Sequence, residues 1–164
     1  MSGKTYRETV FSKFNAGIFV VVVGWLGYTM YRQITVGPVG TRPASNEFLA
    51  GMVLLFAAIG VLFSRLRIDI SADGIKVGYG FIKHSIKWKD VIQCELDTTP
   101  ALHYGGWGIR LARTGGKWRI VYSTVGEPRV MLSLAEGRFR EIAFSSRKPE
   151  QVIRIVNDYI AARE

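Results

Sequence analysis

The residue types that usually perform catalysis or bind metals are scarce in this sequence. It has two histidines, His84 and His103, and one cysteine, Cys94, and they form neither a His-Glu-x-x-His nor a Cys-x-x-Cys motif. A zinc site needs three or four ligands, which these residues do not supply. A single cysteine excludes a disulfide within the chain, which is typical of a reducing compartment. We therefore expect no metal centre and no cofactor.

The acidic residues and the glycine-rich segment give no stronger catalytic signal. Asp90, Glu95 and Asp97 are close in sequence, but no substrate cleft for a carboxylate pair is indicated, so we interpret them as a solvated turn. Residues 104–108 are rich in glycine but lack the Gly-Lys-Ser/Thr ending of a phosphate loop. No Gly-x-Ser-x-Gly motif occurs. The sequence therefore predicts a protein that is not an enzyme.

Basic residues are in excess, and they suggest a binding surface. The net charge is +9, from 22 Lys and Arg against 13 Asp and Glu. Such charge suits the anionic lipid of the cytoplasmic leaflet or an acidic protein, although a solvated charged face is the plain alternative. Nucleic acid is not an expected partner, because no basic recognition helix or nucleic-acid motif is visible. The candidate lipid- or partner-facing residues are Lys83, Lys87, Lys89, Arg110, Arg113, Lys117 and Arg119.

Two uncharged segments near the N-terminus have the length of membrane-spanning helices. With their flanks, the predicted spans are residues 14–34 and 45–64, and about 20 apolar residues suffice to cross the hydrocarbon core. Pro38 and Pro43 interrupt the connector, which predicts a transmembrane hairpin over residues 14–64. A buried helix of a soluble protein would show a polar face, and a cleaved signal peptide would have a shorter apolar core.

Positive charge at the ends of the spans indicates their orientation. Five basic residues lie on the side of the termini and two lie in the connector: Lys4, Arg7, Lys13, Arg65 and Arg67 against Arg32 and Arg42. By the positive-inside rule, both termini are expected in the cytoplasm. Residues 1–13 are then a cytoplasmic N-terminal segment, and residues 65–164 a cytoplasmic domain.

Residues 65–164 show the alternating pattern of β-strands. Turn signals separate about seven or eight short strands, which favours a sandwich or small barrel. In residues 81–90 the alternation predicts one strand, with Trp88 in the core and three lysines in a stripe on the opposite face. Residues 149–163 are predicted to form a helix that caps the β domain, because Pro149 suits a first turn and apolar residues recur at helical spacing.

Three segments resemble the bacterial pleckstrin-homology-like membrane proteins. These are IKWKDVIQCEL from Ile86, GGWGIRLARTGGKWRI from Gly105 and REIAFSSRKPEQVIRIV from Arg140, and the resemblance extends over residues 50–162. It implies a mainly-β, pleckstrin-homology-like barrel with a C-terminal capping helix, a multi-pass place in the bacterial plasma (inner) membrane, and a binding or scaffolding role. The first turn of the domain, residues 71–74, has only Lys76 nearby among basic residues, so specific phosphoinositide recognition is not expected.

These observations together predict a non-enzymatic, membrane-anchored interaction module. Its expected partners are the lipid bilayer and a membrane or cytoplasmic protein bound at the cytoplasmic face. Two alternatives stay open: a domain that binds anionic lipid at the same leaflet, and an accessory subunit of a larger membrane complex.

Overall fold

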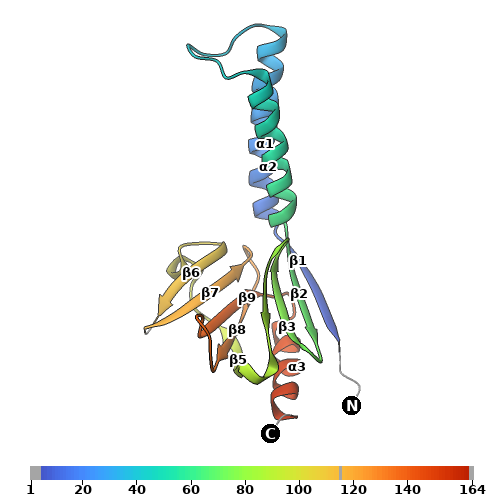
Figure 1. The fold of residues 1–164 in the computed structure, drawn as a ribbon, viewed down its shortest axis with the longest axis vertical. Helices are drawn as coiled ribbons and strands as arrows, with labels where there is room; N and C mark the ends of the chain where they lie inside the picture. The colour runs from blue at the N-terminus through green and yellow to red at the C-terminus, as the bar shows by residue number, and fades with distance from the viewer. Residues whose placement is uncertain (1–4, 115, 163–164) are drawn as a thin grey trace. The chain divides into compact units, whose positions relative to one another are not determined.

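The computed structural model describes residues 5–114 and 116–162. The chain divides into two units: residues 12–64 form one, and the segments before and after them form the other. Figure 1 shows that the first unit is helical and the second consists mainly of strands.

The helical unit is a hairpin of two apolar helices, α1 (Lys13–Thr35) and α2 (Asn46–Phe63). Both are long and apolar enough to cross a membrane, and they coincide with the predicted spans. The helices approach each other closely at Gly60, where an added Cβ atom would lie 2.8 Å from the Cβ atom of Phe19. A larger residue at this position would push the helices apart.

Hydrogen bonds define both ends of the helical hairpin. The hydroxyl of Ser12 caps α1 by accepting from an amide of the first turn, and the hydroxyl of Ser45 caps α2 in the same way. The Ser12 amide donates to the Ser64 carbonyl at 2.8 Å, and the Gln33 side chain donates to the Ala44 carbonyl at 2.7 Å. The chain therefore enters and leaves the hairpin at adjacent positions.

Among the described residues, the other unit has nine strands in two sheets, compared with the predicted total of about seven or eight. The first sheet is antiparallel throughout, in the order β1-β2-β3-β4. Its strands are β1 (Tyr6–Phe11), β2 (Arg65–Ser71), β3 (Gly74–Tyr79) and β4 (Ile82–Ile86). β1 was not predicted from the sequence, because its partner β2 follows only after the whole helical hairpin.

The second sheet has the order β5-β8-β9-β7-β6. Its strands are β5 (Val91–Asp97), β6 (Gly108–Thr114), β7 (Lys117–Ser123), β8 (Arg129–Leu134) and β9 (Glu141–Ser145). Strands β5, β8 and β9 form an antiparallel meander, and the β6–β7 hairpin extends it by pairing β7 in parallel with β9. The hairpin is thus an addition to the free edge of β9, and β6 is an edge strand.

The core of the β unit lies between the two sheets and the C-terminal helix α3 (Pro149–Ala161), which packs on β5 and β8. Ile68 and Val77 of the first sheet, Leu132 and Phe144 of the second, and Val156 of α3 are fully buried. The structure confirms the predicted helix from Pro149 to Ala161, and the last predicted residue, 163, lies outside the described residues.

The predicted strand over residues 81–90 is wrong at its C-terminal end. β4 stops at Ile86, and a short 3₁₀ turn, η1 (Trp88–Asp90), follows. Trp88 is only half-buried and is not a core residue: its indole nitrogen donates to the Ser71 carbonyl at 2.9 Å, and its ring stacks on Tyr159 of α3 with the centroids 4.3 Å apart. Because an indole N–H needs an acceptor when it is withdrawn from water, the partly buried position beside the Ser71 carbonyl suits this side chain.

Candidate functional site

The seven basic residues predicted to form one surface lie at three separate places. Lys83 is on β4. Lys87 lies just before η1 and Lys89 lies within it. The remaining four are on the β6–β7 hairpin. Because the strand ends at Ile86, the three lysines do not form the predicted stripe. Six of the seven side chains are exposed: Lys83, Lys87, Lys89, Arg110, Arg113 and Lys117.

Arg119 is the exception, because it is buried, with 6% of its surface exposed. It belongs to a buried polar cluster that consists of Asp97, Tyr104, Arg119, Arg129 and Glu141. The Arg119 Nε donates to Glu141 at 2.7 Å, and the Arg129 Nε donates to Asp97 at 2.8 Å. The Tyr104 hydroxyl donates to Asp97 at 3.1 Å and accepts from Arg119. Arg119 is therefore not available to a lipid or a partner.

Each arginine of the cluster also lies against the ring of Tyr104. The guanidinium carbons of Arg119 and Arg129 are 5.3 and 5.2 Å from the ring centroid, within the range of cation–π attraction. Tyr104 comes from the short helix η2 (Ala101–Tyr104) in the β5–β6 connection. The cluster thus fixes this connection on the outer face of the second sheet.

The pKa values of the cluster indicate that it is a set of paired charges. Burial raises the pKa of Asp97, but hydrogen bonds from Arg129 and the Thr99 amide outweigh this effect, so the pKa is lowered overall. Burial lowers the pKa of Arg119, but the hydrogen bond to Glu141 and the contact with Tyr104 raise it above its ordinary value. The expectation that Asp97 lies in a solvated turn is wrong, because its ion pair with Arg129 is buried.

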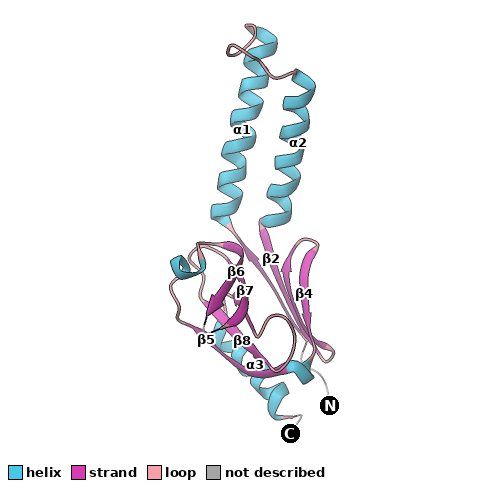
Figure 2. Ribbon diagram, turned by 60° about the vertical axis from the view of Figure 1, so that its left-hand side comes forward, coloured by secondary structure: helices cyan, strands magenta, loops and turns pink. Residues whose placement is uncertain are grey.

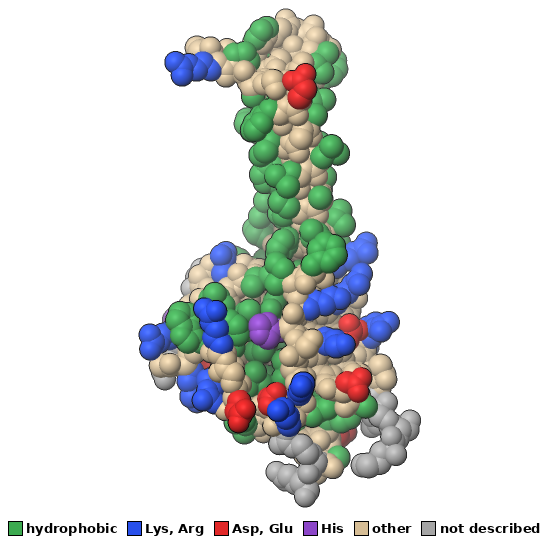
Figure 3. All heavy atoms as spheres, viewed as in Figure 1, with side chains coloured by type: hydrophobic (Ala, Val, Ile, Leu, Met, Phe, Trp, Pro, Cys, Tyr) green, Lys and Arg blue, Asp and Glu red, His purple; other side chains and the backbone are tan. Residues whose placement is uncertain are grey.

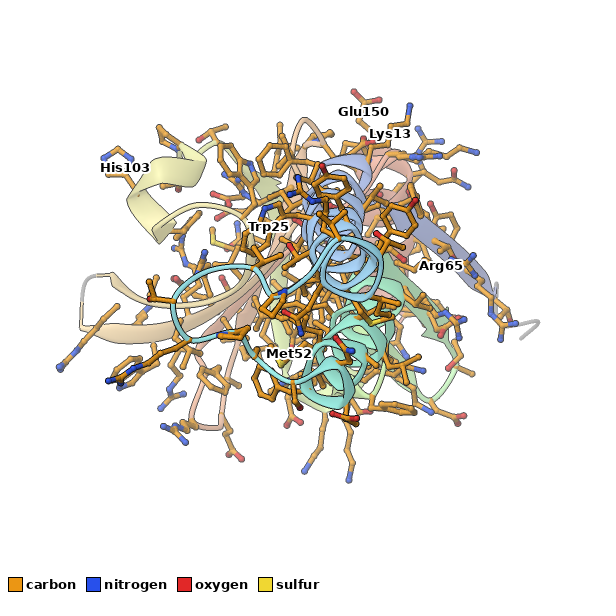
Figure 4. All side chains as sticks on the ribbon, turned by 90° about the horizontal axis from the view of Figure 1, so that it is seen from above. Lys13, Trp25, Met52, Arg65, His103 and Glu150 are labelled. Carbon is orange, nitrogen blue, oxygen red and sulfur yellow. The ribbon has the colours of Figure 1, made fainter. Side chains whose placement is uncertain are left out.

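The two histidines and the cysteine lie apart. The His84 ring is 3.2 Å from the Tyr122 hydroxyl and meets Phe139 edge-on, and burial lowers the pKa of His84. His103 is exposed and points away from the domain (Figure 4). Burial, with a smaller contribution from a nearby carboxylate, raises the pKa of Cys94 to about 12. Within the part of the chain that the structure describes, no three His, Cys, Asp or Glu side chains are grouped closely enough to hold a metal ion.

The β6–β7 hairpin carries a surface that combines apolar and basic side chains. Arg113 pairs with Trp118 across the two strands, so both side chains lie on one face with Leu111, two residues away from Arg113. The guanidinium of Arg113 is 5.9 Å from the Trp118 ring centroid. Leu111 is 56% and Trp118 43% exposed. We call these three residues, Leu111, Arg113 and Trp118, the hairpin surface, and we include Lys117, which lies next to Trp118 at the start of β7 and faces the other way.

An open hollow of about 530 Å³ adjoins the hairpin surface. Ile92 and Trp118 supply apolar walls, and Lys117, Arg138 and Arg140 supply positive charge. Among the described residues that line the hollow, none is acidic. Figure 3 shows the mixture of green apolar and blue basic side chains on this unit. This region would suit a ligand that offers both apolar and acidic groups.

A second basic surface, which the sequence analysis did not identify, lies on the outer face of the first sheet. Gly78 pairs with Arg67 on one side and with Lys83 on the other, so the two basic side chains share one row of the sheet. The next row brings Arg7 and Lys76 to the same face. The alternation of apolar and polar residues in β1, β2 and β3 could have indicated this basic face, but only if β1 had been recognised as a strand.

No protein-family model, curated protein or solved structure matches the chain. The function is therefore inferred from three structural features: the two apolar helices, the hairpin surface and the basic face of the first sheet.

Proposed function

We propose that this chain is a non-enzymatic, membrane-anchored interaction module of the pleckstrin-homology-like type. In this proposal α1 and α2 cross the bacterial plasma membrane, both termini lie in the cytoplasm, and the β domain binds a protein partner. The observation that carries the proposal is the hairpin surface on β6 and β7, of which β6 is an exposed edge strand.

The exposure of the two helices supports the membrane anchor. Within α1 and α2, only Leu49 and Gly60 are buried. Large apolar side chains such as Val20, Val21 and Leu54 are each 71% exposed. Contiguous apolar surface of this extent is rare on soluble monomers. Contact of the same side chains with the hydrocarbon of a bilayer carries no such free-energy penalty.

The topology of the β domain supports the pleckstrin-homology-like assignment. Two sheets of mostly antiparallel strands, followed by one C-terminal helix, are compatible with the β barrel and capping helix that the resemblance implies. In this comparison, the helical hairpin is an insertion between the first and second strands. The β6–β7 hairpin contains one of the three segments that carry the resemblance, and its exposed apolar side chains are the ones proposed to bind a partner.

The geometry of the hairpin defines the kind of partner. An edge strand offers unpaired backbone groups to which an extended segment can add by hydrogen bonding. Leu111 and Trp118 provide an apolar contact, and Arg113 and Lys117 favour acidic side chains on the partner. The basic charges also repel a second copy of β6, which opposes self-association through the same edge. The expected partner is an extended protein segment with apolar and acidic residues.

Extraction of the tagged full chain with its native lipid, followed by mass spectrometry, tests this proposal. One protein in stoichiometric amount is expected with the wild type and with the control Leu96→Ser, which changes an exposed apolar residue on β5. The double variant Leu111→Ser, Trp118→Ser is expected to lose it. Enrichment of anionic lipid without a protein would instead favour the lipid-binding alternative. A protein retained by the double variant would contradict the proposed surface but would be compatible with an accessory subunit that assembles through its helices.

A further inference from the structure

The turn between β3 and β4 exposes an aromatic side chain that the turn itself does not require. Tyr79 pairs with Ile82, so Gly80 and Phe81 form a two-residue turn. Gly80 has a φ of +50°, which suits the first central position of a tight hairpin turn. The second position accepts ordinary polar residues, yet it holds Phe81, which is 89% exposed. Ile82 beside it is 51% exposed.

The β3–β4 turn lies at the end of the first sheet from which the chain enters and leaves the helices. Leu66, the second residue of β2, pairs with Tyr79, the residue just before the turn. Figure 2 shows the β3–β4 hairpin turning at the same end of the sheet as the start of β2. Only one residue separates β1 from α1, and only one separates α2 from β2: Ser12 and Ser64. Since one residue spans at most about 3.6 Å, this end of the sheet cannot lie far from a membrane that the helices cross.

The charges at this end of the sheet are basic. Arg65 begins β2, and Arg67 and Lys83 lie on the same face of the sheet on either side of Gly78. The nearest acidic residue on this face, Asp69, is one row further away and is paired with Arg7 at 2.7 Å. An exposed aromatic ring flanked by basic side chains is the combination that binds the interface of an anionic leaflet.

We propose that the β3–β4 turn inserts Phe81 and Ile82 into the headgroup region of the cytoplasmic leaflet, where Arg67 and Lys83 contact anionic headgroups. This contact would hold the β domain against the bilayer at a third point, besides the two chain connections. It rests on the proposed function only in its membrane anchor and is independent of any partner at the hairpin surface.

Spin labels on single cysteines in the full chain test this contact. The background is Cys94→Ala, and the reporter is Ile82→Cys, which keeps Phe81 in place. The matched control is Asp73→Cys, in the β2–β3 turn at the opposite end of the same sheet. A third label, Val21→Cys in α1, reports on the anchor. The samples are vesicles of phosphatidylcholine with and without phosphatidylglycerol, and the readout is collision with oxygen relative to a water-soluble nickel complex.

The label at position 82 is expected to collide with oxygen in preference to nickel in vesicles that contain phosphatidylglycerol, whereas the label at position 73 collides with nickel. Adding Phe81→Ser is expected to abolish the preference at position 82. If position 21 reports lipid but position 82 behaves like position 73, the turn contact is overturned and the anchor stands. If position 21 reports water, the anchor itself is refuted.

Two further outcomes separate the parts of this proposal. A label at position 82 that collides with neither probe would mean that a protein covers the turn, which would overturn the lipid contact. An oxygen preference that is equal with and without phosphatidylglycerol would overturn the role of Arg67 and Lys83.

Discussion

Removing the carboxylate of Asp97 should destabilise the β domain far more than removing that of Asp69. Both residues accept a hydrogen bond from an arginine Nε, at 2.8 Å from Arg129 and at 2.7 Å from Arg7, so the two ion pairs have nearly the same geometry. They differ in burial: the side chains of Asp97 and Arg129 are 1% and 9% exposed, and those of Asp69 and Arg7 are 32% and 79% exposed.

The difference in burial determines the expected magnitudes. The variant Asp97→Ala leaves Arg129 as a buried charge without its carboxylate and removes the acceptor of Tyr104 and of the Thr99 amide. Breaking a buried pair in this way costs about 3–5 kcal/mol. An exposed pair contributes about 0–1 kcal/mol, which is the loss expected for Asp69→Ala. For a domain of this size, each kcal/mol lowers Tm by roughly 4–8 °C, so Asp97→Ala should lower Tm by about 12 °C or more.

The assay is thermal unfolding of the full chain in detergent, followed by near-ultraviolet circular dichroism of the β domain. Because the pKa of Asp97 is lowered in the folded state, its stabilising effect is complete above its unfolded pKa of 3.8 and is lost as the pH falls through the folded value. The two variants should therefore differ at neutral pH and converge towards the wild type in acid. Equal losses of Tm for Asp97→Ala and Asp69→Ala at neutral pH would refute the account of the cluster.

Three smaller perturbations test other parts of the fold. The variant Gly60→Ala should loosen the packing of the two helices and lower their resistance to unfolding in detergent, whereas Gly51→Ala, whose added Cβ atom would meet nothing within 4 Å, should be neutral or slightly stabilising. Because burial lowers the pKa of His84, the folded domain should lose stability as the pH falls below 6.5, and His84→Gln should remove that part of the pH dependence measured by Tm. The variant Trp88→Ala should lower the free energy of unfolding by less than the loss of about 3–5 kcal/mol that is typical of a core tryptophan, because the ring is only partly buried. A loss within that range, measured by urea unfolding, would contradict the partly buried position of Trp88.

The parts of the fold with a local signal could be predicted from the sequence. The apolar runs predicted both helices of the hairpin, and turn signals between alternating segments predicted a series of short strands, among them β2 and β3. The C-terminal helix followed from Pro149 and the spacing of its apolar residues. These elements are determined by neighbours in the chain, so a single sequence contains the information needed to find them.

Features that depend on distant pairing could not be predicted in the same way. β1 is a strand because Tyr6 pairs with Ile70, which lies beyond the helical hairpin in the sequence. No tight turn joins the two strands, so the sequence near β1 gives no hairpin signal. Likewise Arg119 alternates with apolar residues like any exposed strand residue, and its burial depends on Glu141 and on Tyr104 of η2. The hairpin surface was predicted in part: its basic residues were identified, but Leu111 and Trp118 were not. Their exposure depends on β6 being an edge strand.

Photocrosslinking at the hairpin surface tests the central claim most directly. A photoreactive amino acid replaces Leu111 in the full chain in intact cells, and a matched position, Lys76, carries it on the outer face of the first sheet. The account predicts one discrete crosslinked protein from position 111, absent from position 76 and lost when Arg113→Glu reverses the neighbouring charge. No crosslinked protein from position 111, or the same products from both positions, would contradict it.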